Sequence, residues 1–377
     1  MDIKKKLSKR TEFVLPTFQS SINYSDHINI GSGTPDFTPP ENVQDAFKKS
    51  IDNKKFSYSS WAGLDLLKEN IAIKLKRENN VSADPDSEIL VTTGAQAAVM
   101  SIFMTILDEG DEVLIPSPFY STYEEIARIC GARIVPVITE SSKNFTFNIN
   151  QIPPLLTERT KAIILVSPNN PTATVLPEAL VKDVCKIVNS EELFLISDEI
   201  YEHYVFDSNS HYSVLSNSDM KDRTISIYSL SKGYGMTGIR VGYIVSNKYL
   251  IASIAPFHHA ISICAPVNSQ YAAAEALIDD RVWFEEIKSI LNERRQIWMS
   301  TLDKLELPYG NPQGAYYVCF DISKFKLPAK QISQMLKNDY KIIINPVDTN
   351  YLRGSLMQET ETLKKGLQKL TTFFQKL

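Results

Sequence analysis

Short apolar runs rich in β-branched residues alternate with segments of helical hydrophobic periodicity through the middle of the chain. The run 162–166 is continuously apolar, which is typical of a strand buried on both faces. The alternation predicts an α/β fold, with a mostly parallel, doubly wound sheet covered by helices on both faces. Strands are predicted at 89–92, 112–115, 133–137, 162–166, 194–197, 224–228 and 241–245, and helices at 95–107, 119–129 and 177–188.

The pattern changes after Val245, where strand signals become sparse. Residues 282–305 carry apolar positions at helical spacing, including Trp283, Ile287 and Leu291, which predicts a long helix. The remaining signals predict a smaller α+β region. No Pro/Gly/Ser-rich linker precedes it, so we expect the two parts to be joined by helix and closely packed. Its predicted elements are strands at 315–320 and 341–344 and helices at 329–339 and 360–377.

Composition and charge limit the class of protein. The chain has 377 residues, of which 43% are hydrophobic and 22% charged, so it can bury a sizeable core and its length suggests two domains. The 40 basic and 44 acidic residues leave a net charge of −4, which gives no electrostatic footprint for nucleic acid or an anionic membrane. No apolar run is long enough to cross a bilayer, so we expect neither nucleic acid nor membrane as a partner.

The four cysteines, Cys130, Cys185, Cys264 and Cys319, are far apart and form no CxxC pair. Their mostly apolar surroundings predict buried reduced thiols, and we predict no metal site. Residues 1–10 are basic, but no apolar segment follows them as in a signal peptide. These features predict a cytoplasmic protein.

The segment from Ser229 to Arg240 follows the predicted strand 224–228 and has the sequence SLSKGYGMTGIR. Two serines, a lysine and an arginine around one tight loop make an anion site, for which a phosphate is the natural ligand. A partly buried Lys232 near other cations would have a lowered pKa and become nucleophilic. The alternative is a surface loop with an ordinary lysine.

Three other segments follow predicted strands, at the edge where ligands bind in sheets of this kind. Backbone N–H groups in TTGAQ, residues 92–96, could hold a phosphate, although a simple tight turn explains the glycine equally well. Asp198 needs a cationic partner if it is buried, or else it caps a helix. The loop SPNNPT, residues 167–172, offers two amide side chains on a backbone fixed by prolines, and as a loop it needs no function.

The segments TTGAQ, SPFYSTYEE, VSPNNPT, SDEIYE and SLSKGYGMTGIRVGY occur in this order along the chain. The set resembles the class I/II aminotransferases, the aspartate aminotransferase-like group of fold type I pyridoxal phosphate enzymes, from about Gly31 to Arg353. The resemblance implies a large cofactor-binding domain over residues 46–284. It also implies a small α+β domain formed by residues 1–45 and 285–377.

The resemblance implies pyridoxal phosphate as cofactor and an amino transfer between an L-amino acid and a 2-oxo acid. Lys232 would form an aldimine with the cofactor and shuttle the Cα proton. Asp198 would pair with the pyridine nitrogen and keep it protonated, which makes the ring an electron sink. Tyr201 and Asn170 would hydrogen-bond the 3′-oxygen.

The same resemblance assigns the phosphate and the ring of the cofactor. Tyr120 would stack on the ring, or Phe119 if the alignment slips by one residue. Tyr58 matches a tyrosine that reaches the phosphate of the neighbouring subunit, which implies a homodimer with shared active sites. The phosphate would be held by Gly94, Ala95, Gln96, Ser229, Ser231 and Arg240.

Two positions near the chain ends would bind the substrate. Gly33 lies in a segment that resembles the family's N-terminal substrate segment, and Asn170 would also lie near the substrate. Arg353 matches the arginine that clamps the α-carboxylate, a task suited to its planar fork. Without the other motifs, a surface salt bridge would be the simpler interpretation of Arg353.

The chain departs from the family pattern near the substrate. Ala173 stands where the family usually has glycine, and the loop 345–351 before Arg353 is short. No second fixed cation is visible for a dicarboxylate, which favours a neutral, aromatic or aliphatic, amino donor. A lyase, cyclase or oxidase on the same fold stays an alternative. A non-catalytic regulatory module that binds the cofactor is a weaker one, because no DNA-binding region is visible.

Overall fold

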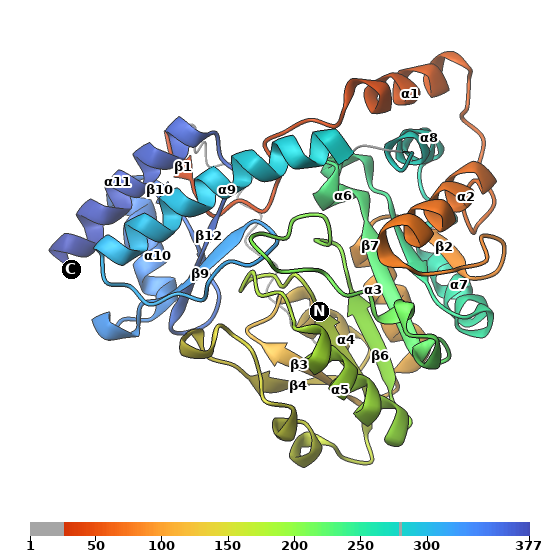
Figure 1. Ribbon diagram of the computed structural model, residues 1–377, viewed down its shortest axis with the longest axis horizontal. Coiled ribbons are helices and arrows are strands. Elements are labelled where there is room, and N and C mark those ends of the chain that lie inside the picture. The colour runs from red at the N-terminus through yellow and green to blue at the C-terminus, as the bar shows by residue number, and fades with distance from the viewer. Residues whose placement is uncertain (1–25, 279–280) are drawn as a thin grey trace, which may run out of the picture.

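The computed structural model describes residues 26–278 and 281–377. The basic segment 1–10 and most of the N-terminal part of the expected small domain therefore lie outside the described residues. The centre of the molecule is a seven-stranded sheet with the order β2-β8-β7-β6-β5-β3-β4 (Figure 1). Its strands are β2 (Ile89–Thr92), β3 (Glu112–Ser117), β4 (Arg133–Ile138), β5 (Thr160–Val166), β6 (Phe194–Asp198), β7 (Thr224–Ser229) and β8 (Gly242–Val245).

The sheet is parallel except for β8, which pairs antiparallel with both β2 and β7. This confirms the predicted mostly parallel sheet. Two antiparallel pairings in succession leave β2 running in the same direction as β7. The carboxyl ends of β2, β5, β6 and β7 therefore meet at one edge, where ligands bind in open α/β sheets.

Both faces of the sheet are buried, as the continuous apolar run in β5 predicts. Ile164 and Val166 face a cluster formed with α3, α4 and α7, whereas Ile163 and Leu165 face α5 on the other side. Alternate residues of one strand point to opposite faces, so a strand covered twice must be apolar throughout. The helices around the sheet are α1 (Glu41–Asp52), α2 (Asp65–Lys74), α3 (Ala95–Ile106), α4 (Thr122–Ile129), α5 (Glu178–Ser190), α6 (Leu230–Gly233), α7 (Lys248–Ser262) and α8 (Val267–Ala276).

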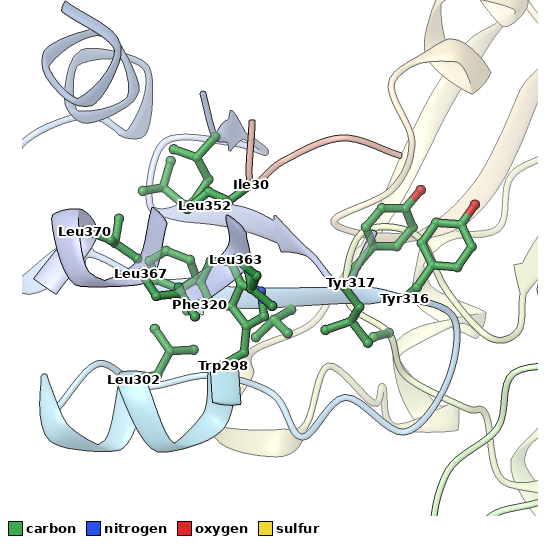
Figure 2. Close-up of a cluster of buried hydrophobic side chains, with 14 of the residues drawn as sticks. Ile30, Trp298, Leu302, Tyr316, Tyr317, Phe320, Leu352, Leu363, Leu367 and Leu370 are labelled. Atoms are coloured by element: carbon green, nitrogen blue, oxygen red, sulfur yellow. The ribbon is translucent and has the colours of Figure 1, made fainter. Parts of the chain in front are cut away.

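A second apolar cluster forms beside two smaller sheets. One is the antiparallel sheet β11-β12-β9, and the other is the parallel pair β1-β10, which joins segments from opposite ends of the chain. Trp298 lies at the centre of the cluster, surrounded by leucines and Phe320 (Figure 2). The elements are β1 (Ile28–Asn29), α9 (Arg281–Lys304), β9 (Tyr317–Asp321), α10 (Ala329–Tyr340), β10 (Ile342–Ile343), β11 (Asn345–Pro346), β12 (Tyr351–Ser355) and α11 (Thr360–Lys376).

The long helix α9 runs from the side of α6 and α8 toward α11 (Figure 1). Among the described residues, no helix is long and apolar enough to cross a membrane. None of the four cysteines forms a disulfide, but only Cys185 and Cys319 are buried, so the expectation of generally buried thiols is half right. Helices α1, α2, α6, α7 and α8 were not predicted from the sequence, and α4 begins three residues later than expected.

The packing of β12 against α9 gives a test of the small-sheet core. A Cβ at Gly354 would collide with the buried indole ring of Trp298. We expect Gly354→Ala to lower the free energy of unfolding by about 1–3 kcal/mol, the usual cost of overpacking. The measurement is urea denaturation. Gly238→Ala is the matched control, because no atom lies within 4 Å of the added methyl group, and a comparable loss in that variant would contradict the prediction.

Candidate active site

A cavity of about 410 Å³ opens at the carboxyl ends of β2, β5, β6 and β7. Most of the residues predicted as site residues line it, although they come from segments more than 300 positions apart. The lining comprises Gly33, Thr34, Ala95, Gln96, Tyr120, Asn170, Ile200, Tyr201, Ser229, Ser231, Lys232, Thr237, Arg240, Tyr317 and Arg353. Gly94, Asp198 and Tyr58 are the predicted site residues outside this lining.

Lys232 sits in the single helical turn α6 directly after β7, so the end of a buried strand fixes its position. Its Nζ donates a hydrogen bond to the carbonyl oxygen of Gly33 at 2.8 Å. Burial and the guanidinium groups of Arg353 and Arg240 lower the pKa of Lys232 to about 8. Both causes penalise the charged ammonium, so an unusually large share of this lysine is a neutral, nucleophilic amine near neutral pH.

Arg240 lies at the end of the cavity that is closest to the start of α3. Its Nη1 donates to the carbonyl oxygen of Thr237 at 3.0 Å and lies 3.5 Å from Ser231 Oγ. A side chain at Gly94 would collide with this guanidinium, so glycine is required where the two approach. Gly94 therefore shapes the site without lining it. The N-terminus of α3, two serines and an arginine together form an anion site.

Arg353 lies in β12, in the small antiparallel sheet, and also lines the cavity. Its Nη1 donates to Asn170 Oδ1 at 2.8 Å, and its Nη2 donates to the Gly31 carbonyl oxygen at 3.0 Å. Its Nε is buried with no hydrogen-bond partner among the described residues. The surface-salt-bridge alternative does not hold, since no acidic residue in the described ranges pairs with Arg353.

The cavity is strongly cationic. Lys232, Arg240 and Arg353 line it, and the lining includes no aspartate or glutamate. The hydrogen-bond partners of the three cations are carbonyl, amide and hydroxyl oxygens, which accept protons but carry no full charge. Such a site gains most from an anionic ligand, and it can hold more than one negative group.

Asp198 lies behind the cavity, at the last position of β6, and is 4% exposed. The Tyr123 hydroxyl donates to its Oδ2, and the Ile200 N–H donates to its Oδ1 at 3.2 Å. Burial raises the pKa of Asp198 to about 6, while both hydrogen bonds oppose the rise. Within the described ranges no cationic side chain pairs with it. No helix begins in the segment that follows Asp198, where the Ile200 N–H bond closes a turn, so the alternative of a helix cap is wrong.

Tyr123 and Tyr317 contact predicted site residues, and neither was predicted from the sequence. Tyr123 follows Tyr120 by three positions in SPFYSTYEE, a spacing that places both on one side of a helical turn. Tyr317 is the first residue of β9, and its hydroxyl lies 3.0 Å from that of Tyr201. Nothing in the local pattern at 315–320 distinguishes it from a core aromatic residue.

Tyr120 and Phe119 were the two alternatives for the aromatic residue that stacks on the ring, and they lie in different surroundings. Tyr120 lines the cavity, whereas Phe119 packs against the apolar cluster of α3, α4 and α7. His258 lies outside the lining, and its Nε2 accepts a hydrogen bond from the Thr93 N–H at 3.2 Å. Burial lowers the pKa of His258 to about 4, so the neutral ring can serve as this acceptor. Tyr58 is 76% exposed and lies away from the cavity of its own chain.

The two departures near the substrate segment leave the backbone well supported. Ala173 has a φ of +60°, the left-handed conformation for which glycine is favoured. Its carbonyl oxygen accepts hydrogen bonds from the N–H groups of Gln313 and Gly314, both at 2.9 Å. The short loop before Arg353 is a tight hairpin between β11 and β12, closed by the Val347 N–H and the Tyr351 carbonyl oxygen at 3.0 Å.

Comparison with known proteins gives consistent matches over nearly the whole chain. A family model described as "Aminotransferase class I and II" matches residues 25–370. Aspartate aminotransferase of Pyrococcus abyssi is 33% identical over 377 residues, with 97% of each chain covered. Aromatic-amino-acid aminotransferase 2 of Thermococcus litoralis is 30% identical, again over 97% of each chain. The solved aromatic aminotransferase of Pyrococcus horikoshii OT3 has a TM-score of 0.90 at 32% identity, covering 93% of this chain and 96% of that one.

The low pKa of Lys232 can be measured directly on protein freed of any bound aldehyde. We expect an amine-reactive reagent to modify Lys232 with a pH midpoint near 8, well below that of ordinary surface lysines at roughly 10.4. Peptide mapping after pulse labelling between pH 6 and 11 measures this midpoint. Arg240→Gln removes one of the charges that lower the pKa, so the midpoint should rise. A midpoint in the range of surface lysines would contradict the assignment.

Proposed function

Because the chain belongs to the class I and II aminotransferases, we propose that it moves an amino group from an L-amino acid to a 2-oxo acid in this cavity. Members of the family use pyridoxal phosphate. The observation that carries the proposal is the meeting of Lys232, Arg240 and Arg353 in one cavity with no acidic lining. The two arginines would each pair with an anion, the phosphate or the substrate carboxylate, and the neutral amine of Lys232 would hold the aldehyde.

The residues present fit pyridoxal phosphate at both ends of the ligand. Asp198 is a buried carboxylate that no described cation neutralises, and a protonated pyridine nitrogen supplies the missing charge. At the other end, Ser229, Ser231 and Arg240 join the N-terminus of α3 to form a phosphate cup with Gly94, Ala95 and Gln96. Tyr120 is the aromatic side chain available to stack on the ring, and Tyr201 and Asn170 line the remaining side.

When bound, pyridoxal phosphate supplies an electron sink for the electron pair left at the substrate Cα. Lys232 would hold the cofactor aldehyde and, once released from it, would take the proton from the substrate Cα at its Nζ. The pKa of about 8 suits this role, since the amine must bind and release a proton near neutral pH. Asp198 would hold a proton at the ring nitrogen.

Arg353 would bind the α-carboxylate of the substrate. Asn170 and the Gly31 carbonyl oxygen fix its guanidinium, and its buried Nε still needs an acceptor. A planar fork held in this way binds a carboxylate with defined orientation. The orientation would place the Cα of the substrate within reach of Lys232, because both side chains line one cavity.

We further propose a neutral, aromatic or aliphatic, amino donor. The phosphate and the α-carboxylate would take the two arginines and the aldehyde would take Lys232, and the described residues of the lining supply no further cation for a side-chain carboxylate. The named relatives include both aspartate and aromatic aminotransferases, so the family alone does not decide. A donor screen of the purified protein with 2-oxoglutarate and pyruvate in parallel is the test, and preference for aspartate would contradict the proposal.

We propose a homodimer in which Tyr58 reaches the phosphate of the neighbouring subunit. Tyr58 is 76% exposed, and Phe56 and Trp61 beside it are 70% and 47% exposed. Three exposed aromatic side chains within six residues are typical of an interaction surface. Sedimentation analysis tests the dimer, and a monomer with full activity would contradict it.

The division of the chain into a large domain of residues 46–284 and a small domain of residues 1–45 and 285–377 is likewise a proposal. Separate apolar clusters at the seven-stranded sheet and at the small sheets support it. We also propose a cytoplasmic location, which four cysteines that form no disulfide support, because thiols stay reduced in that compartment.

The half-reaction tests the proposed function. We expect the holoenzyme mixed with its amino donor to convert the cofactor to the pyridoxamine form, as seen in its absorption spectrum, and to need a 2-oxo acid for recovery. Release of ammonia without a 2-oxo acid would indicate a lyase or oxidase instead. Lys232→Ala should abolish turnover, because the variant lacks the amine that carries the proton, and turnover at the wild-type rate would contradict the central role of Lys232.

The contact between Tyr123 and Asp198 gives a pH-dependent prediction. The Tyr123 hydroxyl helps to keep Asp198 ionised, so Tyr123→Phe should raise the pKa of Asp198 above about 6. A protonated carboxyl group holds a pyridinium less well. We therefore expect the Kd for pyridoxal phosphate to rise roughly tenfold at pH 7, the value of a hydrogen bond to a charged group.

Titration of the cofactor between pH 5 and 8 measures this effect. In the wild-type protein the affinity should fall as the pH drops through about 6, since protonation removes the charge of Asp198. In Tyr123→Phe the fall should begin at higher pH. Identical Kd values and pH profiles for the two proteins would show that Tyr123 does not act on Asp198.

A further inference from the structure

Tyr317 lies between the two ends of the cavity and contacts a residue from each. It is the first residue of β9, is 1% exposed, and lines the cavity with its hydroxyl end. Figure 2 shows Tyr316 and Tyr317 standing apart from the leucine side chains of the cluster that surrounds Trp298. The strand is thus anchored in the small-sheet core while its first residues extend to the site.

The hydroxyl group of Tyr317 contacts the cofactor side of the cavity. It lies 3.0 Å from the Tyr201 hydroxyl, and the two rings meet edge to face with centroids 5.7 Å apart. Tyr201 is 2% exposed, and this is the hydrogen bond that its hydroxyl makes among the described residues. A buried hydroxyl takes the orientation that its hydrogen bonds allow, and this bond therefore decides where the Tyr201 proton points.

The ring of Tyr317 contacts the substrate side. The guanidinium carbon of Arg353 lies 4.3 Å from the ring centroid, so the cation stacks on the aromatic face. Asn170 and the Gly31 carbonyl oxygen hold two corners of the guanidinium at its edge. The ring of Tyr317 fixes the plane of the guanidinium, whereas the two hydrogen bonds alone would allow that plane to tilt.

These two contacts reinforce each other. A cation over the ring draws electron density from the phenol and makes the Tyr317 hydroxyl the better donor of the pair. When Tyr317 donates to Tyr201, the proton of Tyr201 is left for a ligand in the cavity. The fit is close, since a Cβ at Gly33 would lie 2.8 Å from the Tyr317 hydroxyl.

We propose that Tyr317 is a positioning residue that serves both ends of the cavity, orienting the Tyr201 hydroxyl with its own hydroxyl and holding the Arg353 guanidinium with its ring. The proposal rests on the proposed function, because it assigns Tyr201 to the cofactor and Arg353 to the substrate carboxylate. The two roles belong to different atoms of one side chain, so two substitutions can separate them.

The experiment compares Tyr317→Phe and Tyr317→Leu in the holoenzyme with two readouts. One is the pH midpoint of the cofactor absorption band, and the other is the Kd of propionate, a carboxylate without an amino group, read from that band. Tyr309→Phe is the matched control. It removes a hydroxyl that donates to Asp303 at 2.9 Å, in a segment bridged to β9 but remote from the cavity.

We expect Tyr317→Phe to shift the pH midpoint upward by about 0.5 unit or more, because Tyr201 then stabilises negative charge in the cavity less. Its propionate Kd should stay within about twofold, because the ring remains under Arg353. Tyr317→Leu should shift the midpoint similarly and raise the propionate Kd about fivefold or more. Tyr309→Phe should change neither readout.

Wild-type values for both readouts in both Tyr317 variants would overturn the proposal. An equal change in propionate Kd in Tyr317→Phe and Tyr317→Leu would overturn the role of the ring. An unmoved midpoint in Tyr317→Phe would overturn the role of the hydroxyl. A wild-type protein that binds no pyridoxal phosphate would instead overturn the proposed function, and the assignment of Tyr317 with it.

Discussion

Three cations confined to one cavity without an acidic partner in its lining are the constraint on which the rest of the site depends. Lys232, Arg240 and Arg353 repel one another, and part of that repulsion is visible in the lowered pKa of Lys232, about 8. Neutral oxygens satisfy their hydrogen bonds without cancelling their charge. Because no charged side chain of the lining neutralises these cations, an anionic ligand gains their electrostatic attraction when it binds. The arrangement therefore favours ligand binding over an internal salt-bridge network.

Elements from different parts of the chain fix the positions of the three cations. Strand ends of the large sheet supply Lys232 and the start of α3 beside Arg240, whereas Arg353 comes from β12 and the Gly31 segment from near the other end of the chain. These two are tied together, because β1 pairs with β10 and the Ser355 N–H donates to the Ile30 carbonyl oxygen at 2.8 Å. The part of the site around Arg353 is therefore one unit built from distant segments.

The sequence predicts the parts of this site that strand ends generate, because strand, loop and functional residue are local neighbours. The lysine after β7, the aspartate at the end of β6 and the asparagine loop after β5 are all of this kind. The strand β8 was predicted but its antiparallel direction was not, since an apolar run carries no information on strand direction. Helices α7 and α8 follow the last sheet strand, where their apolar positions lack a contrasting polar face.

Tyr123 and Tyr317 were not predicted for another reason. Each contacts a site residue that is distant along the chain, 75 positions away for Tyr123 and 116 for Tyr317. A tyrosine in an apolar run has the same local pattern whether its hydroxyl meets Asp198, Tyr201 or a solvent molecule. Only the meeting of distant segments in space distinguishes these cases. Residues that position others are therefore harder to predict than the residues they position.

The two departures from the family pattern, Ala173 and the short loop 345–351, both have a structural explanation. Ala173 keeps the left-handed backbone expected of glycine, because two N–H groups bind its carbonyl oxygen and compensate for the strain of its Cβ. In the short hairpin, the Asn345 side chain donates to the Gly31 carbonyl oxygen at 2.9 Å, the same oxygen that Arg353 uses. The backbone of the loop at Ala173 is therefore retained, and the short hairpin contributes a side chain that shares an acceptor with Arg353.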